Sequence, residues 1–218
     1  MLDIPSGYNP AASDWKAFLQ AWRDAPKKYP GASIFNVLDL QQGTPEADIA
    51  ALQERLHLPS LPPSYVDFLR AARVDAARWE MEDYGLYPLE KIDYFQNTEP
   101  EWFNILKNEW PIDSPDSGYF VYGAKQDGSH FKSEFLEGFI DIGSYFPTDC
   151  LILNSRVQTS DGEFECILRC AAFSVRTLSF AAMMRALCIY ECQDVDSYPP
   201  YEDSLMNSGI PALITSGH

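Results

Sequence analysis

Four short β-rich runs occupy the C-terminal half of the chain, and their spacing limits the possible folds more than any other feature. The runs YFVYG, FIDIG, CLILN and EFECILRC are bounded by glycine, aspartate, asparagine and proline, which favour turns. One face of the last run is expected to carry its alternating apolar residues, Phe164, Cys166, Leu168 and Cys170. Asp161-Gly162 is a tight-turn sequence, so it predicts a hairpin between the last two runs.

Amphipathic helices precede these runs. The segment SDWKAFLQAWRDA places tryptophan and phenylalanine side chains on one stripe of a helix. A second helix is expected behind Thr44, which would act as its N-cap. A third helix is expected from about Pro63, and it should continue through residues 71–75.

Two later helices have clear start signals. Thr98 and Glu101 have the spacing of a capping box. The closing helix, LSFAAMMRALCIYE, has Ser179 as its expected N-cap and a buried stripe that ends near Leu187. Because the chain runs from helices to strands and then to a closing helix, it predicts an α+β fold. In such a fold an antiparallel or mixed twisted sheet has helices packed on one side.

Composition narrows the class of protein. The 218 residues contain 32 acidic and 16 basic side chains, a net charge of −16. Such a charge repels nucleic-acid phosphate and favours a basic protein as the partner. No apolar run approaches the ~18 residues of a membrane helix, so we expect no membrane association. The N-terminal residues show no secretory signal and the cysteine count of five is odd, so we expect a cytoplasmic protein without a disulfide framework.

The order of the expected helices and strands, together with several short sequence motifs, resembles that of the SMI1/KNR4 (SUKH) superfamily. The matching pieces are LPPSYVDFLRAA, GLYPLEKIDYF, FIDIGSYFPTDCLILN with DGEFECI, and LSFAAMMRAL. Family members often have an Asn-Gly-Gly turn where this chain has residues 71–75. The resemblance covers about residues 45–192. We therefore expect one SUKH-like domain over residues 1–192, with an added N-terminal helix, and an irregular acidic tail over residues 193–218.

The resemblance implies a function without a catalytic centre. Many bacterial members of the superfamily are immunity proteins, which neutralise a cognate toxin by binding it. Fungal members are regulatory scaffolds. We expect the first role, with noncovalent blocking of the active or substrate-binding surface of the toxin, and keep as the alternative a non-enzymatic scaffold with an endogenous protein partner.

The sequence offers few candidate residues for catalysis or for metal binding. Cys188 and Cys192 share a helix face, but a closed zinc site needs four ligands at tight spacing, so we expect no metal and no cofactor. The weakest of the three hypotheses is a cysteine enzyme that uses Cys150 and His130. Nothing near either residue in the sequence would activate it. We therefore expect a protein that is not an enzyme.

The strongest candidate for a binding surface is the segment 75–116. It contains eleven acidic and three basic side chains, a net charge of −8, and eight interleaved aromatic residues. Acidic residues steer a basic partner and aromatic residues anchor it, although core burial of the aromatic residues is an equally good explanation. The residues expected to contact the partner are Glu80, Glu82, Asp83, Tyr84, Glu99, Glu101, Trp102, Asp113 and Asp116.

Overall fold

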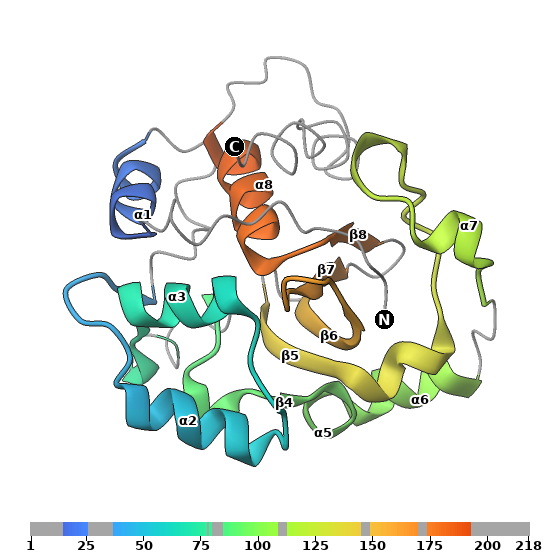
Figure 1. Cartoon of the computed structure of the whole chain (residues 1–218), viewed down its shortest axis with the longest axis horizontal. Helices are drawn as coiled ribbons and strands as arrows, with labels where there is room; N and C mark the ends of the chain where they lie inside the picture. The colour runs from blue at the N-terminus through green and yellow to red at the C-terminus, as the bar shows by residue number, and fades with distance from the viewer. Residues whose placement is uncertain are drawn as a thin grey trace.

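The computed structural model describes residues 15–25, 37–77, 79, 85–108, 113–144, 149–169 and 174–192. At its centre lies an antiparallel sheet in the strand order β3-β5-β6-β7-β8, with β4 also paired to β5 (Figure 1). Its strands are β3 (Gly85–Leu86), β4 (Asp93–Tyr94), β5 (Phe139–Ser144), β6 (Cys150–Gln158), β7 (Phe164–Arg169) and β8 (Ser174–Thr177). A separate pair joins β1 (Leu38–Asp39) to β2 (Arg73–Val74). The expected α+β fold with an antiparallel sheet is confirmed.

The predicted hairpin between β6 and β7 is also confirmed. Gly162 has a φ of 88°, and its N–H donates to the carbonyl of Thr159 at 3.1 Å. Glycine adopts this positive φ without strain, which is why the turn forms here. The apolar face of β7 joins the core through Phe164, Cys166 and Leu168, as the alternation predicts, whereas Cys170 lies outside the described residues.

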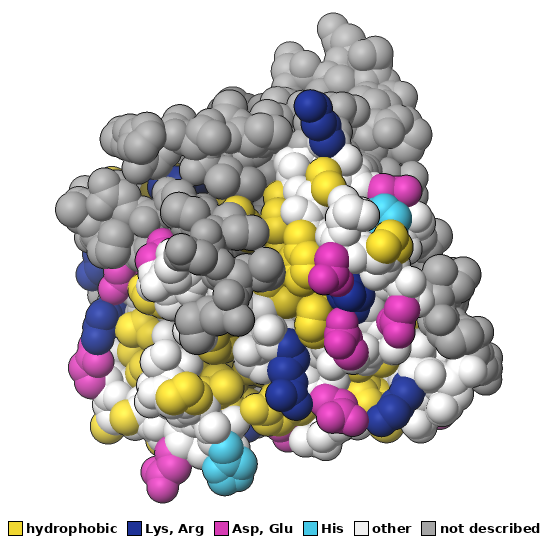
Figure 2. Space-filling model, turned by 45° about the vertical axis from the view of Figure 1, so that its right-hand side comes forward, with side chains coloured by type: hydrophobic (Ala, Val, Ile, Leu, Met, Phe, Trp, Pro, Cys, Tyr) yellow, Lys and Arg dark blue, Asp and Glu magenta, His cyan; other side chains and the backbone are white. Residues whose placement is uncertain are grey.

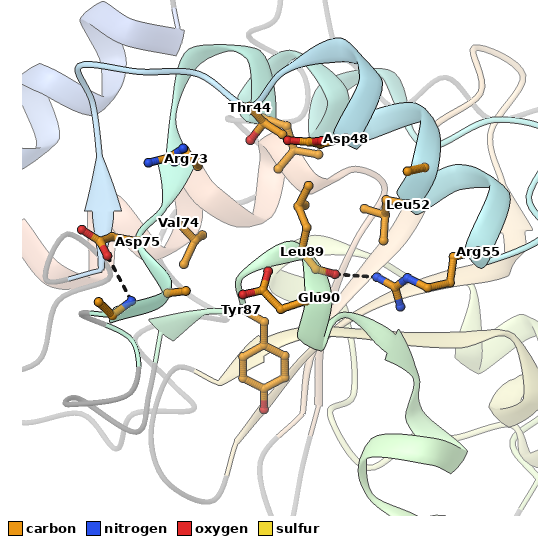
Figure 3. A pocket seen from close by; sticks show the side chains of 14 residues that line it. Thr44, Asp48, Leu52, Arg55, Arg73, Val74, Asp75, Tyr87, Leu89 and Glu90 are labelled. Carbon is orange, nitrogen blue, oxygen red and sulfur yellow. Dashed lines mark hydrogen bonds between the residues drawn. The ribbon is translucent and has the colours of Figure 1, made fainter.

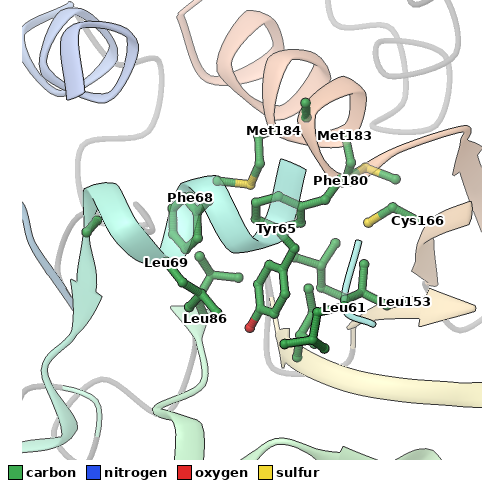
Figure 4. Close-up of a cluster of buried hydrophobic side chains, with 14 of the residues drawn as sticks. Leu61, Tyr65, Phe68, Leu69, Leu86, Leu153, Cys166, Phe180, Met183 and Met184 are labelled. Atoms are coloured by element: carbon green, nitrogen blue, oxygen red, sulfur yellow. The ribbon is translucent and has the colours of Figure 1, made fainter. Parts of the chain in front are cut away.

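Helices α3 (Pro63–Ala71) and α8 (Phe180–Cys192) pack on one face of the sheet (Figures 1 and 4). Phe180 is their shared contact, because its ring lies 4.9 Å from that of Tyr65 and 5.1 Å from that of Phe68. The stripe predicted for the closing helix is fully buried, at Met183, Met184 and Leu187. This layer is therefore held by large apolar side chains at helical spacing.

Helix α1 (Trp15–Asp24) belongs to the same core. The ring of Trp15 lies 5.6 Å from that of Phe68 and 5.9 Å from that of Phe180. Trp22 is buried, and its Nε1–H donates to the Glu191 carboxylate at 2.8 Å. The N-terminal helix is thus tied by packing and by a buried polar bond to the last helix of the fold.

A second, smaller layer covers the opposite face of the sheet, in addition to the helices expected on one side. It consists of α5 (Phe95–Thr98), α6 (Pro100–Asn108) and the 3₁₀ helix η5 (Ser133–Gly138). Its buried side chains include Phe95, Phe103 and Leu136. They pack with Ile152 and Ile167 of the sheet. Because these two isoleucines face away from α3 and α8, they need a second layer to exclude water.

Buried hydrogen bonds anchor the segment that connects α6 to η5. It contains α7 (Asp116–Tyr119) and η4 (Gly123–Lys125). The hydroxyl groups of Tyr119 and Tyr122 donate to the Glu165 carboxylate at 2.7 and 3.0 Å. Asn154 Nδ2 donates to the same carboxylate at 2.7 Å, so this fully buried acid is well satisfied.

The outer edge of β8 is hydrogen-bonded to residues 126–128 of the same chain. The side-chain amide of Gln126 accepts from the backbone N–H of Arg176 at 2.7 Å and donates to the Arg176 carbonyl at 3.2 Å. Ser174 N–H donates to the Gly128 carbonyl at 2.8 Å. These bonds occupy backbone groups that an additional strand would need, so this edge does not invite strand addition.

Two expectations about the early helices are wrong. Thr44 does not cap α2 (Glu46–Arg55), because its N–H donates to the Leu69 carbonyl at 2.7 Å and its hydroxyl faces the Ala72 carbonyl at 3.5 Å. Residues 71–75 do not continue α3. Ala72 is extended, with φ −146° and ψ 157°, and the next two residues form β2. Pairing with β1 overrides the local helix propensity.

The two predicted caps of the later helices have different outcomes. Thr98 ends α5, and its hydroxyl donates to the Phe95 carbonyl at 3.4 Å, so the capping box predicted with Glu101 is wrong. Ser179 is confirmed as the cap of α8, because its Oγ accepts from Ala182 N–H at 3.1 Å. The tail predicted over residues 193–218 lies outside the described residues. Of the helices that the structure describes, none has the length and apolar character to span a bilayer.

Candidate functional site

Helix α6 presents an aromatic side chain to solvent. Phe103 and Leu106 point into the second layer and are buried. Trp102, one position away, is 38% exposed, and it is the single large hydrophobic residue exposed among those that the structure describes. A tryptophan held on a well-packed helix loses little conformational freedom on binding, which makes it a good anchor for a partner.

Acidic residues flank Trp102. Glu101 is exposed on the same helix, and Glu99 lies half-buried immediately before it. The nearest lysine of α6, Lys107, is paired with Glu137 at 3.2 Å. The structure therefore brings together three of the predicted contact residues, and the local charge around the tryptophan is negative.

The other two described acids of the predicted site have partners within the chain. Asp113 accepts from the backbone N–H of Ser133 at 2.6 Å and from its hydroxyl at 3.0 Å. These bonds lower the pKa of Asp113. Asp116 lies 2.6 Å from the Lys132 ammonium, which also contacts Glu134 at 3.0 Å. Both acids therefore hold the start of η5 in place.

Most of the described aromatic residues of the segment 75–116 do not form an exposed surface. Glu80, Glu82, Asp83 and Tyr84 lie outside the described residues. Of the aromatic residues in the segment 75–116, two are core residues, Phe95 and Phe103. Three are partly buried, Trp79, Tyr87 and Tyr94. Core burial thus accounts for most of the described aromatic residues, and Trp102 is the exception.

Figure 2 shows one face of the molecule, on which acidic side chains alternate with lysine and arginine around patches of hydrophobic surface. This agrees with the ion pairs of Lys107 and Lys132. The Lys107–Glu137 pair is exposed on both sides, so it contributes little to stability. These ion pairs do neutralise part of the acidic excess, so an acid without a basic partner is the more useful marker of a binding surface.

A cleft of about 600 Å³ lies between α2, β2 and the 3₁₀ helix η3 (Leu89–Lys91) (Figure 3). Its apolar lining includes Leu52, Leu69, Val74 and Leu89. Its charged lining residues are Asp48, Arg55, Arg73, Asp75 and Glu90. The cleft therefore combines an apolar floor with ionic groups at its walls, which is the usual composition of a binding site.

Hydrogen bonds hold the walls of the cleft. The guanidinium of Arg55 on α2 donates to the carbonyls of Leu89 and Ile92, each at 2.5 Å, and so ties α2 to η3. Asp75 N–H donates to the Val37 carbonyl at 2.8 Å. Tyr87 N–H donates to the Ile142 carbonyl at 2.9 Å. Because each wall is tied to the rest of the fold, the cleft is preformed.

Sequence reasoning missed this cleft. Asp48 lies in the first turn of α2, and Glu90 is one of the eleven acids of the segment 75–116. They stand 42 positions apart in the chain. Nothing in their spacing predicts that they line one cavity, because the contact between α2 and η3 that Arg55 makes brings these two walls together.

Two of the described thiols, Cys150 and Cys166, are poor nucleophiles. Burial raises the pKa of Cys150, and the nearby carboxylates of Asp141 and Glu99 raise it further. Burial also raises the pKa of Cys166 well above its ordinary value. Both side chains are therefore held as neutral thiols. Within the described ranges, no group of three or more histidine, cysteine, aspartate and glutamate side chains is arranged to hold a metal ion.

Comparisons of the chain with protein-family models, with curated proteins and with solved structures find no match.

Proposed function

We propose that this protein is an immunity protein that binds a cognate toxin noncovalently and blocks its active or substrate-binding surface. The partner has a basic surface, which the net charge of −16 attracts at long range. The order of the short sequence motifs, which resembles that of the SUKH superfamily, supports the same role.

One observation carries the proposal: Trp102 is exposed on α6 beside Glu101 and Glu99. An aromatic side chain that enters a pocket of the partner excludes water from the ion pairs around it. Truncation of such an anchor typically costs ~2 kcal/mol or more. The acids at the edge act mainly on the association rate.

The proposal is tested by co-expression with the protein encoded by the adjacent gene, followed by pull-down and by measurement of the dissociation constant. Trp102→Ala should weaken the complex by about 30-fold or more, the equivalent of ~2 kcal/mol. Glu101→Gln should lower the association rate at low salt and lose its effect at high salt, because exposed charges are screened.

Asn104→Ala is the matched control, because Asn104 is also exposed on α6. It lies roughly 200° around the helix axis from Trp102. Binding that is equally strong in the wild type, Trp102→Ala and Asn104→Ala would exclude α6 from the interface. If the adjacent protein neither binds the chain nor loses its toxicity in its presence, the immunity role is wrong.

A further inference from the structure

The cleft between α2 and η3 contains two carboxylates that have no partner among the described residues. Asp48 on α2 and Glu90 on η3 are exposed, and neither has a hydrogen bond or ion pair within the part of the chain that the structure describes. Figure 3 shows Asp48 on the upper wall and Glu90 on the lower wall, with Leu89 between them and Leu52 to one side. Two unpaired acids on opposite walls of one cavity attract a cation.

The two arginine side chains that line the cleft, Arg55 and Arg73, differ in how strongly they would repel a bound cation. The guanidinium of Arg55 is occupied by the carbonyls of Leu89 and Ile92. Arg73 extends from β2 away from Leu52 and Glu90 in Figure 3. Asp75, whose carboxylate accepts from Ala77 N–H at 3.1 Å, adds a third acid to the lining. Acids therefore outnumber bases, and the unpaired acids face the cavity.

The floor of the cleft suits the stem of a long side chain. Leu52, Leu69, Val74 and Leu89 form an apolar surface beneath the carboxylates. Lysine and arginine place their methylene groups on apolar surface and their charged head in a polar environment. Few other groups in proteins have both properties.

We propose that this cleft receives a lysine or arginine side chain from the surface of the protein partner. The stem packs on the leucine floor, and the charged head lies above it, near the carboxylates of Asp48 and Glu90. This rests on the proposed function for the identity of the partner, since a basic protein displays such side chains. It assigns a second contact region, separate from Trp102, that uses residues outside the predicted site.

The cleft itself is tested without the toxin. The full chain, labelled with ¹⁵N, is titrated with N-acetyl-lysine amide and with N-acetyl-arginine amide, and the amide shifts of Thr44, Ala51 and Glu90 are followed. N-acetyl-norleucine amide, which has an apolar stem and no charge, is the neutral control. The lysine or arginine probe should shift these amides with a millimolar dissociation constant, and the neutral probe should bind at least severalfold more weakly.

Two substitutions should act in opposite directions. Glu90→Gln should weaken binding of the cationic probes by about two- to fivefold, the usual range for a solvent-accessible ion pair. Arg73→Gln should strengthen it, because it removes a like charge from the lining. Glu54→Gln, on the same helix as Asp48 but outside the lining, is the matched control and should have no effect.

The inference is overturned if no cleft amide shifts with either cationic probe, if the norleucine probe binds equally well, or if N-acetyl-glutamate amide binds more tightly than both. It is also overturned if Glu90→Gln and Arg73→Gln change binding in the same direction. Each of these results concerns the cleft alone, because the pull-down with Trp102→Ala tests the proposed function separately.

Discussion

Replacement of Asp141 by asparagine should remove a large part of the pH dependence of stability. Asp141 lies on β5 and is fully buried. Its Oδ1 accepts from Gly143 N–H at a long 3.4 Å, and its Oδ2 has no hydrogen-bond partner among the described residues. Burial raises its pKa to about 7, and Glu99 adds to the shift. The Gly143 N–H, which donates to the charged form, acts in the opposite direction.

The direction in which stability changes with pH follows from the number of protons bound in the folded and the unfolded state. An unfolded aspartate has a pKa of 3.8, so between pH 3.8 and about 7 the folded protein keeps a proton that the unfolded chain has lost. Stability is therefore highest below the unfolded value, falls as the pH rises to about 7, and is constant above that. At ~1.4 kcal/mol per pKa unit, the whole change is about 4 kcal/mol, of which about 3 kcal/mol falls between pH 5 and pH 8.

The measurement is urea unfolding followed by tryptophan fluorescence at several pH values between 5 and 8. The quantity compared is the difference in unfolding free energy between Asp141→Asn and wild type, because other buried acids titrate in the same window. This difference should shift in favour of the variant by about 3 kcal/mol as the pH rises. Asp48→Asn, the same chemical change at an exposed position, is the matched control.

A difference for Asp141→Asn that stays constant within about 0.5 kcal/mol would refute the reasoning, since it would mean that Asp141 has an ordinary pKa in the folded protein. A shift in favour of wild type would refute it more strongly, because it would require a partner that stabilises the charged carboxylate.

Two further predictions concern the core. Leu187→Ala should lower the unfolding free energy by ~2–5 kcal/mol, because Leu187 is fully buried on α8; a loss below about 0.5 kcal/mol in urea unfolding would contradict the packing of this helix. Glu163→Gln should also flatten the dependence of stability on pH between about 4.5 and 7, because burial raises the pKa of Glu163 to about 7 despite two hydrogen bonds from Ser64; an unchanged slope relative to wild type would show that Glu163 is charged throughout.

Local signals were sufficient for several elements. The alternation of Phe164, Cys166 and Leu168 and the Asp161-Gly162 turn are properties of a few adjacent residues, and both appear as predicted. The same holds for the Ser179 cap. These features depend on backbone preference and on periodicity within one element, so a single sequence carries them. The α+β class follows from their order.

The tertiary structure decided which side chains of the acidic segment are exposed. Composition cannot distinguish Phe103, which is buried, from Trp102, which is exposed, until the contact of α6 with the sheet is known. Nor can it show that Asp113 binds Ser133 or that Asp116 pairs with Lys132. Such pairings join residues 16 or 20 positions apart, and local propensity contains no information about them.

The sequence by itself thus determined the class of fold, the hairpin and the apolar faces, because these arise from short-range preference and from burial of apolar residues. Only the tertiary structure decided the end of α3 at Ala71 and the cleft of Asp48 and Glu90. The physical reason is that both depend on contacts between distant segments. The Arg55 guanidinium joins α2 to η3, and β1 pairs with β2 across 34 to 36 positions. The energy of that pairing exceeds the small helix preference of the residues that it recruits.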